Sequence, residues 1–304
     1  MSLLSLLIAL AAEKSLSSSF WRFDYYYQKY ASFFQRYIVQ LKRKDNIFAY
    51  TLFLLLPVAS IYAILSLVDN AFLHFIISTL ILIICFGCFT TRSSYKQYLH
   101  AASRGEETTS TFHHQQLLED KNLHEMSFGQ ALIWLNYRYY IAIMLFFTLF
   151  GATGVIFYRL LTTVIEQQNN NVLAQDNTEN QNNQNESKGD AEEEKTNTPH
   201  ISAGCKHYHS FLFLLDWLPV RITSFGYMFV GHFVKAFPIW LESFFDGKKP
   251  THKVLTDVAQ KSEDSLIDTG NCTAEPCLLV RLSKRNVLLL LAVIASLTLF
   301  GVIR

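Results

Sequence analysis

The sequence predicts an all-α, polytopic membrane protein with about four spans plus re-entrant or interfacial helices. Half of the 304 residues are hydrophobic and only 17% are charged. The mean hydropathy is positive, at +0.17. The apolar residues also gather in runs long enough for transmembrane helices of ~20 residues. We therefore expect residues 1–304 to form a single membrane domain. The net charge of +1 gives no reason to expect a nucleic-acid partner.

The N-terminal part is expected to form helices that do not cross the membrane. The start, "MSLLSLLIAL", is apolar but lacks a basic leader region, so it predicts a short mature helix rather than a cleaved signal. In residues 13–46 the aromatic side chains Tyr26, Tyr30, Phe33 and Tyr37 recur at helical spacing. This pattern predicts an amphipathic helix at the membrane interface. A helix packed on the membrane domain remains the alternative.

Four apolar runs are candidate spans. Ile47–Val68 and Ala71–Phe89 are separated by Asp69 and Asn70, so we expect them to form a hairpin. Tyr139–Leu161 is the third candidate and Val287–Ile303 the fourth.

The distribution of Lys and Arg sets the expected orientation and raises a conflict. Basic residues precede the first run and follow the second, so in a bacterial inner membrane both segments face the cytoplasm. If the third run crossed the membrane fully, the basic residues that precede the fourth run would lie outside the cytoplasm. Either 211–232 crosses once more, or 139–165 is re-entrant and breaks at Gly151–Gly154. We favour re-entry, because glycine loosens a helix, although the same glycines could serve close helix packing.

Residues 166–198 differ in composition from the rest of the chain. They are rich in Asn and Gln, then acidic, with few apolar residues. Such a segment buries too little surface to offset its ordering entropy. We expect a disordered insert without chemistry of its own.

Polar side chains within or beside apolar runs are the candidate site residues, because ionisable groups at membrane depth are costly and usually functional. The candidates for binding an anionic ligand are Arg104, Asn136, Arg159, Asp216, Arg221, His232 and Lys235. The planar guanidinium suits phosphate. In "DWLPVR" (216–221), Asp216 could instead cap a helix that begins near Pro219, or form an internal ion pair with Arg221. No metal site, cofactor motif or catalytic triad is visible.

Four segments carry a resemblance to a known family. "YLHAASRGEE", "ALIWLNYRYYIA", "LDWLPVRI" and "GHFVKAFPIW" resemble, in this order, the hallmark segments of the AmpE family of inner-membrane proteins. The resemblance covers nearly the whole chain except 166–198. It implies a multi-pass inner-membrane protein that modulates β-lactamase induction, with a link to peptidoglycan recycling and the response to β-lactams.

The AmpE family in turn resembles the CobD/CbiB membrane proteins of cobalamin synthesis. Two of their motifs are matched here, one by Asp216, Pro219 and Arg221 and the other by a group that ends at Arg159; its members are Gly151, Gly154, Tyr158 and Arg159. Their glycine-arginine-acid motif is matched at Arg104, and their acidic asparagine segment only at Asn136.

Two functions follow from these resemblances. The first is a non-enzymatic signalling accessory protein, embedded in the lipid bilayer, whose polar cluster binds a small anionic ligand; neither cofactor nor protein partner is identified. The alternative is a CobD/CbiB-like membrane enzyme that acts on a phosphorylated small molecule. The enzyme would need a pair of carboxylates beside Arg221 and Arg159, and the nearby acids are Glu106, Glu107 and Asp216.

Overall fold

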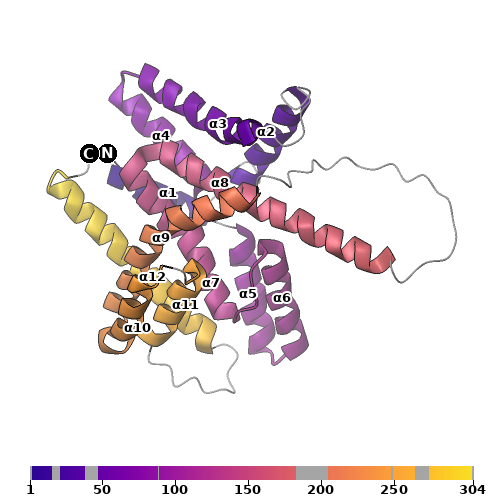
Figure 1. The fold of residues 1–304 in the computed structure, drawn as a ribbon. Helices are drawn as coiled ribbons and strands as arrows, with labels where there is room; N and C mark the ends of the chain where they lie inside the picture. The colour runs from indigo at the N-terminus through magenta and orange to yellow at the C-terminus, as the bar shows by residue number, and fades with distance from the viewer. Residues whose placement is uncertain are drawn as a thin grey trace.

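The described part of the protein is built from helices alone, as the sequence predicts (Figure 1). This computed structural model describes residues 2–15, 21–37, 47–87, 89–182, 205–247, 249–263 and 274–302. The helices are α1 (Ser2–Ser15), α2 (Phe23–Tyr37), α3 (Ile47–Leu67), α4 (Ala71–Cys85), α5 (Phe89–Ser103), α6 (Glu107–Lys121), α7 (Phe128–Asn136), the π-helical turn η2 (Tyr137–Ile141), α8 (Ala142–Asn182), α9 (Cys205–Val230), α10 (Phe233–Phe245), α11 (Thr251–Ser262) and α12 (Ala274–Leu299).

One helical stretch within the described residues, Phe128–Gln167, is long and apolar enough to cross a membrane. A second candidate arises if the bent pair Ala71–Cys85 and Thr90–Ser103 is counted as one span. The four predicted spans therefore stay a prediction.

The chain reverses direction at Gly151, inside the third apolar run. Gly151 has φ 66° and ψ −158°, a conformation that interrupts α8. The ring of Phe146 stacks on that of Tyr158 with centroids 4.5 Å apart. The hydroxyl of Tyr139 lies 3.0 Å from Glu166, 27 residues further along, whereas a straight helix would separate these residues by ~40 Å. Phe128–Gln167 is therefore a helical hairpin, the geometry that the re-entrant alternative predicts.

The other helices pack around this hairpin. Helices α3 and α4 both pack on α8, α4 also packs on α1, and Asn70 caps α4 by accepting a hydrogen bond from the Phe72 amide. Helices α5 and α6 form a second hairpin that turns at Gly105, which has φ +76°. Helix α9 packs on α8, α10, α11 and α12, and α7 packs on α11 and α12. These contacts bring the chain around α7 and η2 against α9 and α11.

Helix α2 packs on α3, as the alternative of a packed helix predicts, and Tyr30 of the predicted aromatic face takes part through a 2.8 Å hydrogen bond to the Phe53 carbonyl. Phe23, Tyr27 and Phe34 are buried, and the rings of Tyr27 and Phe34 meet Phe53 of α3 edge-on. The exposed aromatic residues of the predicted face include Tyr26 and Phe33.

Two other predictions need correction or a boundary change. Asp216 does not cap a helix, because α9 begins at Cys205 and continues through Pro219. Helix α8 extends to Asn182, so residues 166–182 of the predicted insert are helical; residues 183–198 lie outside the described part of the chain. Glu166 belongs to the packed hairpin.

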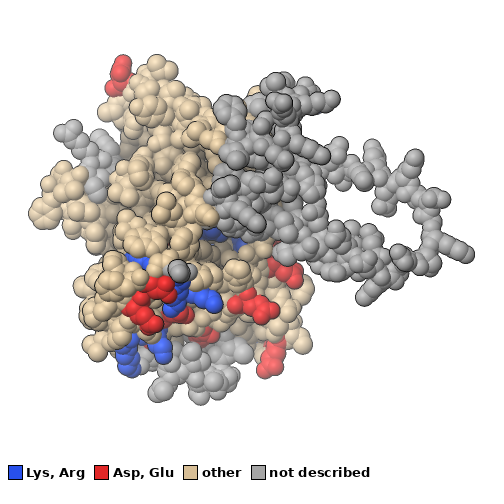
Figure 2. Space-filling model, in the orientation of Figure 1, with Lys and Arg blue, Asp and Glu red and all other residues tan. Residues whose placement is uncertain are grey.

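Charged side chains are unevenly distributed over the face shown in Figure 2. They gather in the lower half of the view, whereas the upper half, where α3 and α4 lie, is uncharged or not described, apart from one acidic group at its upper edge.

Candidate functional site

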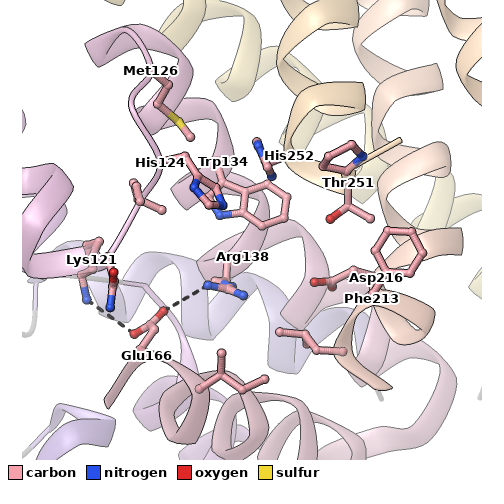
Figure 3. Close-up of a pocket in the computed structure, with 15 residues that line it drawn as sticks. Lys121, His124, Met126, Trp134, Arg138, Glu166, Phe213, Asp216, Thr251 and His252 are labelled. Atoms are coloured by element: carbon pink, nitrogen blue, oxygen red, sulfur yellow. Dashed lines mark hydrogen bonds and ion pairs between the residues drawn. The ribbon is translucent and has the colours of Figure 1, made fainter. Parts of the chain in front are cut away.

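A polar cavity of about 270 Å³ lies where the two ends of the hairpin meet α9 and α11 (Figure 3). Its walls come from the α6–α7 connection, α7, η2, α8, α9 and the start of α11. The lining residues are Lys121, Asn122, Leu123, His124, Met126, Trp134, Arg138, Ile165, Glu166, Leu212, Phe213, Asp216, Pro250, Thr251 and His252. It contains acidic, basic and imidazole groups together with one indole.

Arg138 lies at the centre of this cavity, between the carboxylates of Glu166 and Asp216 (Figure 3). The residue is 8% exposed, and its guanidinium lies 5.4 Å from the ring centroid of Trp134. Its Nη1 is 3.5 Å from a carboxylate oxygen of Glu166. Its buried Nε has no hydrogen-bond partner. A buried guanidinium with an unused donor is costly unless a ligand accepts from it.

Glu166 is held by a short chain of hydrogen bonds. The Tyr139 hydroxyl lies 3.0 and 3.1 Å from the two carboxylate oxygens of Glu166. Lys121 donates to the same hydroxyl at 2.9 Å and lies 4.0 Å from Glu166. The hydroxyl can therefore accept from the ammonium and donate to the carboxylate.

Asp216 faces Arg138 from the opposite wall. It is 2% exposed, and Oδ1 accepts hydrogen bonds from Tyr137 at 2.7 Å and Tyr158 at 2.9 Å. Tyr137 and Tyr158 come from the two arms of the hairpin, so the reversal at Gly151 is what brings both phenols to one carboxylate. Both hydrogen bonds end on Oδ1, and the carboxylate points into the cavity (Figure 3).

Two histidines and a tryptophan form the remaining wall. The rings of His124 and His252 are 5.0 Å apart, and Trp134 meets His252 edge-on at 6.1 Å. Burial, helped by His124 and Lys253, lowers the pKa of His252 to about 4, while Asp257 acts in the opposite direction. His252 is therefore neutral at pH 7 and can either donate or accept a hydrogen bond.

The formal charges in this cavity balance, since the cations Lys121 and Arg138 face the carboxylates Glu166 and Asp216. Such a site suits a polar molecule that carries charges of its own. An anionic group of the ligand would meet Arg138, and a hydroxyl, amine or amide donor would meet Asp216.

Of the predicted site residues, Asp216 lines this cavity and Arg159 lies close to it. Arg159 is 4% exposed, and its guanidinium lies 4.3 Å from the ring centroid of Tyr139 and 5.3 Å from that of Phe23. It therefore stacks against the residue that holds Glu166.

Arg221 does not pair with Asp216. Its guanidinium donates to the main-chain carbonyls of Trp217, Ser243 and Asp246 at 3.1, 3.0 and 3.3 Å, and it lies 4.0 Å from the ring centroid of Trp217. The bonds to Ser243 and Asp246 satisfy carbonyls at the C-terminal end of α10, where helix carbonyls lack a partner inside the helix. Its buried Nε has no hydrogen-bond partner, so a ligand contact by Arg221 stays a prediction.

The other candidates are scattered. Arg104 is exposed in the α5–α6 turn, and His232 and Lys235 are exposed at the start of α10. The Oδ1 atom of Asn136 is buried without a partner and belongs to a different, larger cavity. Helix α9 ends at Val230, so Arg221 and His232 do not lie on one continuous helix.

A pair of carboxylates does converge, but it is not the expected one. Glu106 and Glu107 are exposed, whereas Glu166 joins Asp216, and the pair surrounds Arg138 rather than Arg221. Sequence reasoning missed Lys121, His124, Trp134 and His252 as well. The one available signal was a charge at each end of the glycine-broken apolar run, Arg138 and Glu166.

Comparisons with known proteins agree with the hallmark segments. A family model described as "Regulatory signalling modulator protein AmpE" matches residues 1–188 and 193–304. A curated relative, Protein AmpE of Shigella flexneri, is 27% identical over 236 residues, which cover 73% of this chain and 72% of the relative. No solved structure matches the chain. The chain therefore belongs to the AmpE family of regulatory signalling modulator proteins.

Proposed function

We propose that this protein is a multi-pass protein of the bacterial inner membrane that modulates β-lactamase induction by binding a small polar ligand in the polar cavity. The family supports a regulatory role. The unpaired Nε of Arg138 opposite Asp216 is the observation that supports ligand binding. Peptidoglycan fragments combine carboxylates with amines and hydroxyls, so they fit the chemistry of this cavity and connect it with cell-wall recycling.

Exposed apolar side chains support the membrane location. Leu67 and Phe72, on either side of the α3–α4 turn, are 82% and 68% exposed, and Leu299 at the end of α12 is 88% exposed. Large apolar surfaces of this kind are rare on soluble monomers. Together with the basic residues before α3 and in α5, they support an orientation with the α3–α4 turn outside and the polar cavity on the cytoplasmic side.

The topology can be tested by cysteine labelling in a chain whose five native cysteines are replaced by serine, because Cys277 is exposed and would itself react. We expect Asp69→Cys, in the α3–α4 turn, to react with a membrane-impermeant maleimide in intact spheroplasts. Glu106→Cys, exposed in the α5–α6 turn, should react only after lysis. Labelling of both positions before lysis, or of neither after lysis, would contradict the proposed orientation.

Ligand binding can be tested with Arg138→Gln. Native mass spectrometry of the purified protein with a muramyl tripeptide should show bound ligand, and the variant should bind at least ~10-fold more weakly, the effect of losing one charged hydrogen bond. The matched control is Lys261→Gln, which removes one exposed charge on α11. In a strain with an inducible β-lactamase, Arg138→Gln should change β-lactamase induction and Lys261→Gln should not, when the membrane contains equal amounts of the two variants. Equal binding by both variants would contradict the proposed site.

A membrane enzyme acting on a phosphorylated small molecule is the second candidate function. The convergence of Asp216 and Glu166 around Arg138 favours it, because an acid, a base and a cation in one cavity can serve proton transfer. Incubation with a candidate substrate followed by product analysis separates the two functions. Ligand recovered unchanged with wild-type protein supports the regulatory role.

A further inference from the structure

A second, larger cavity of about 760 Å³ lies between α1, α5, α7, η2 and α12. Its volume is within the range of pockets that hold one small ligand, ~300–1,000 Å³. Part of its lining is aliphatic and includes Leu132 and Leu135 of α7 and Leu288 and Leu291 of α12. We call it the amphipathic cavity, because another part of its lining is basic.

The basic part of the lining has a net positive charge. Arg92 is paired with Glu13, whose carboxylate also accepts a hydrogen bond from Tyr140 at 2.8 Å. Lys96 and Lys284 are exposed beside this pair and have no ion-pair partner among the described residues. Two ammonium groups thus share this cavity with aliphatic side chains.

Two buried polar atoms in the same cavity lack partners. These are the Oγ1 atom of Thr91 and the Oδ1 atom of Asn136. The carbonyl-type oxygen of Asn136 can only accept, so it calls for a donor such as a hydroxyl group. The cavity therefore combines positive charge, a hydroxyl acceptor and aliphatic side chains.

The cavity lies where α12 changes from charged to apolar. Lys284 and Arg285 precede the apolar stretch that begins at Val287, and Leu288 in the cavity wall is 65% exposed. In a membrane protein this change in composition marks the headgroup level, where lysine side chains meet phosphate.

We propose that the amphipathic cavity binds one anionic phospholipid whose headgroup carries a hydroxyl, as in phosphatidylglycerol. The phosphate lies between Lys96 and Lys284, and the headgroup hydroxyl donates to Asn136. An acyl chain lies along the aliphatic residues of the lining. This inference rests on the proposed membrane location but not on ligand binding in the polar cavity.

Native mass spectrometry of the full-length protein in detergent tests the lipid site. Phosphatidylglycerol should be retained more strongly than phosphatidylcholine with the same acyl chains. The double variant Lys96→Gln/Lys284→Gln should bind phosphatidylglycerol about 30-fold more weakly, the change expected for two lysines at ~1 kcal/mol each. The control Lys253→Gln/Lys261→Gln removes two exposed charges on α11 and should change nothing.

A second comparison tests the hydroxyl contact and does not depend on the lysine variants. Wild-type protein should prefer phosphatidylglycerol to phosphatidic acid, which lacks the headgroup glycerol, and Asn136→Leu should abolish that preference. Equal binding of phosphatidylcholine and phosphatidylglycerol, or full binding by the double lysine variant, would overturn the proposal. If inorganic phosphate binds and phosphatidylglycerol does not displace it, Lys96 and Lys284 bind a soluble anion instead of a lipid. Maleimide labelling reports the membrane topology separately, so failure here is distinguishable from failure of the proposed location.

Discussion

The two phenols that donate to Asp216 allow a sharp test of how the hairpin is held to α9. Tyr137→Phe and Tyr158→Phe each remove one hydrogen bond to the buried Oδ1 atom and keep the packed ring. Hydrogen bonds to charged groups contribute ~1.5–3 kcal/mol each. While one donor remains, it can strengthen its own bond, so we expect each single variant to lose about 1.5 kcal/mol of unfolding free energy.

The double variant should lose more than the sum of the single losses. Asp216 is 2% exposed, and in the double variant neither phenol donates a hydrogen bond to its carboxylate. Much of the cost of desolvating the carboxylate is then uncompensated. We expect a total loss of about 5 kcal/mol, which is a coupling of about 2 kcal/mol. Unfolding of the purified variants in mixed detergent micelles, followed by tryptophan fluorescence, measures these differences.

Tyr227→Phe is the matched control, because this buried phenol pairs with the neutral hydroxyl of Ser283 at 3.3 Å. We expect a loss of about 1 kcal/mol, additive with that of Tyr137→Phe. Additive losses for Tyr137→Phe and Tyr158→Phe, or single losses no larger than the control, would refute the shared-carboxylate argument.

Three further predictions concern other parts of the molecule. Gly151→Ala should cost ~1–3 kcal/mol, because only glycine tolerates its φ and ψ; Gly247→Ala, with open space around the added methyl, should cost well under 1 kcal/mol by the same unfolding assay. Arg221→Met should lower stability by about 3 kcal/mol through lost bonds to carbonyls, yet leave induction per molecule in the membrane unchanged; reduced induction at normal abundance would restore Arg221 to the site. Burial lowers the pKa of His252 to about 4, so its contribution to stability is present above pH ~6.5 and is lost as the pH falls toward 4. After allowance for solvent screening the loss is about 2 kcal/mol, and His252→Gln should flatten that part of the pH–stability profile.

The helices with uniform apolar composition were the predictable part of the fold. The predicted run Ile47–Val68 matches α3 within one residue, because its limits are set by composition alone. Ala71–Phe89 was predicted too long, since α4 ends at Cys85, ahead of Gly87 with φ +76°. A conformation of this kind depends on what the following segment packs against, which periodicity does not reveal.

The candidate site was predictable only where one residue carried the signal. Asp216 stood out as an acid in an apolar run, and it lines the polar cavity. Arg221 stood out for the same reason, but its bonds go to carbonyls at the end of α10, a helix that begins only after the turn at Gly231 and His232. Composition cannot distinguish a buried arginine that binds a ligand from one that satisfies main-chain carbonyls.

One side chain connects the two cavities, because Tyr139 lines the amphipathic cavity and forms hydrogen bonds with two residues that line the polar cavity. The ring of Tyr139 lines the amphipathic cavity, while its hydroxyl bonds to Glu166 and Lys121 of the polar cavity. The residue is fully buried in η2, so movement of its side chain would change the lining of the amphipathic cavity and the hydrogen bonds to Glu166 and Lys121. The hydrogen bond from Tyr139 to Glu166 can form only because the chain reverses direction at Gly151. The conformation of Gly151 therefore fixes the position of the Glu166 carboxylate and of the Tyr139 ring together. A sequence change at this bend would therefore alter the polar site without touching any residue that lines it.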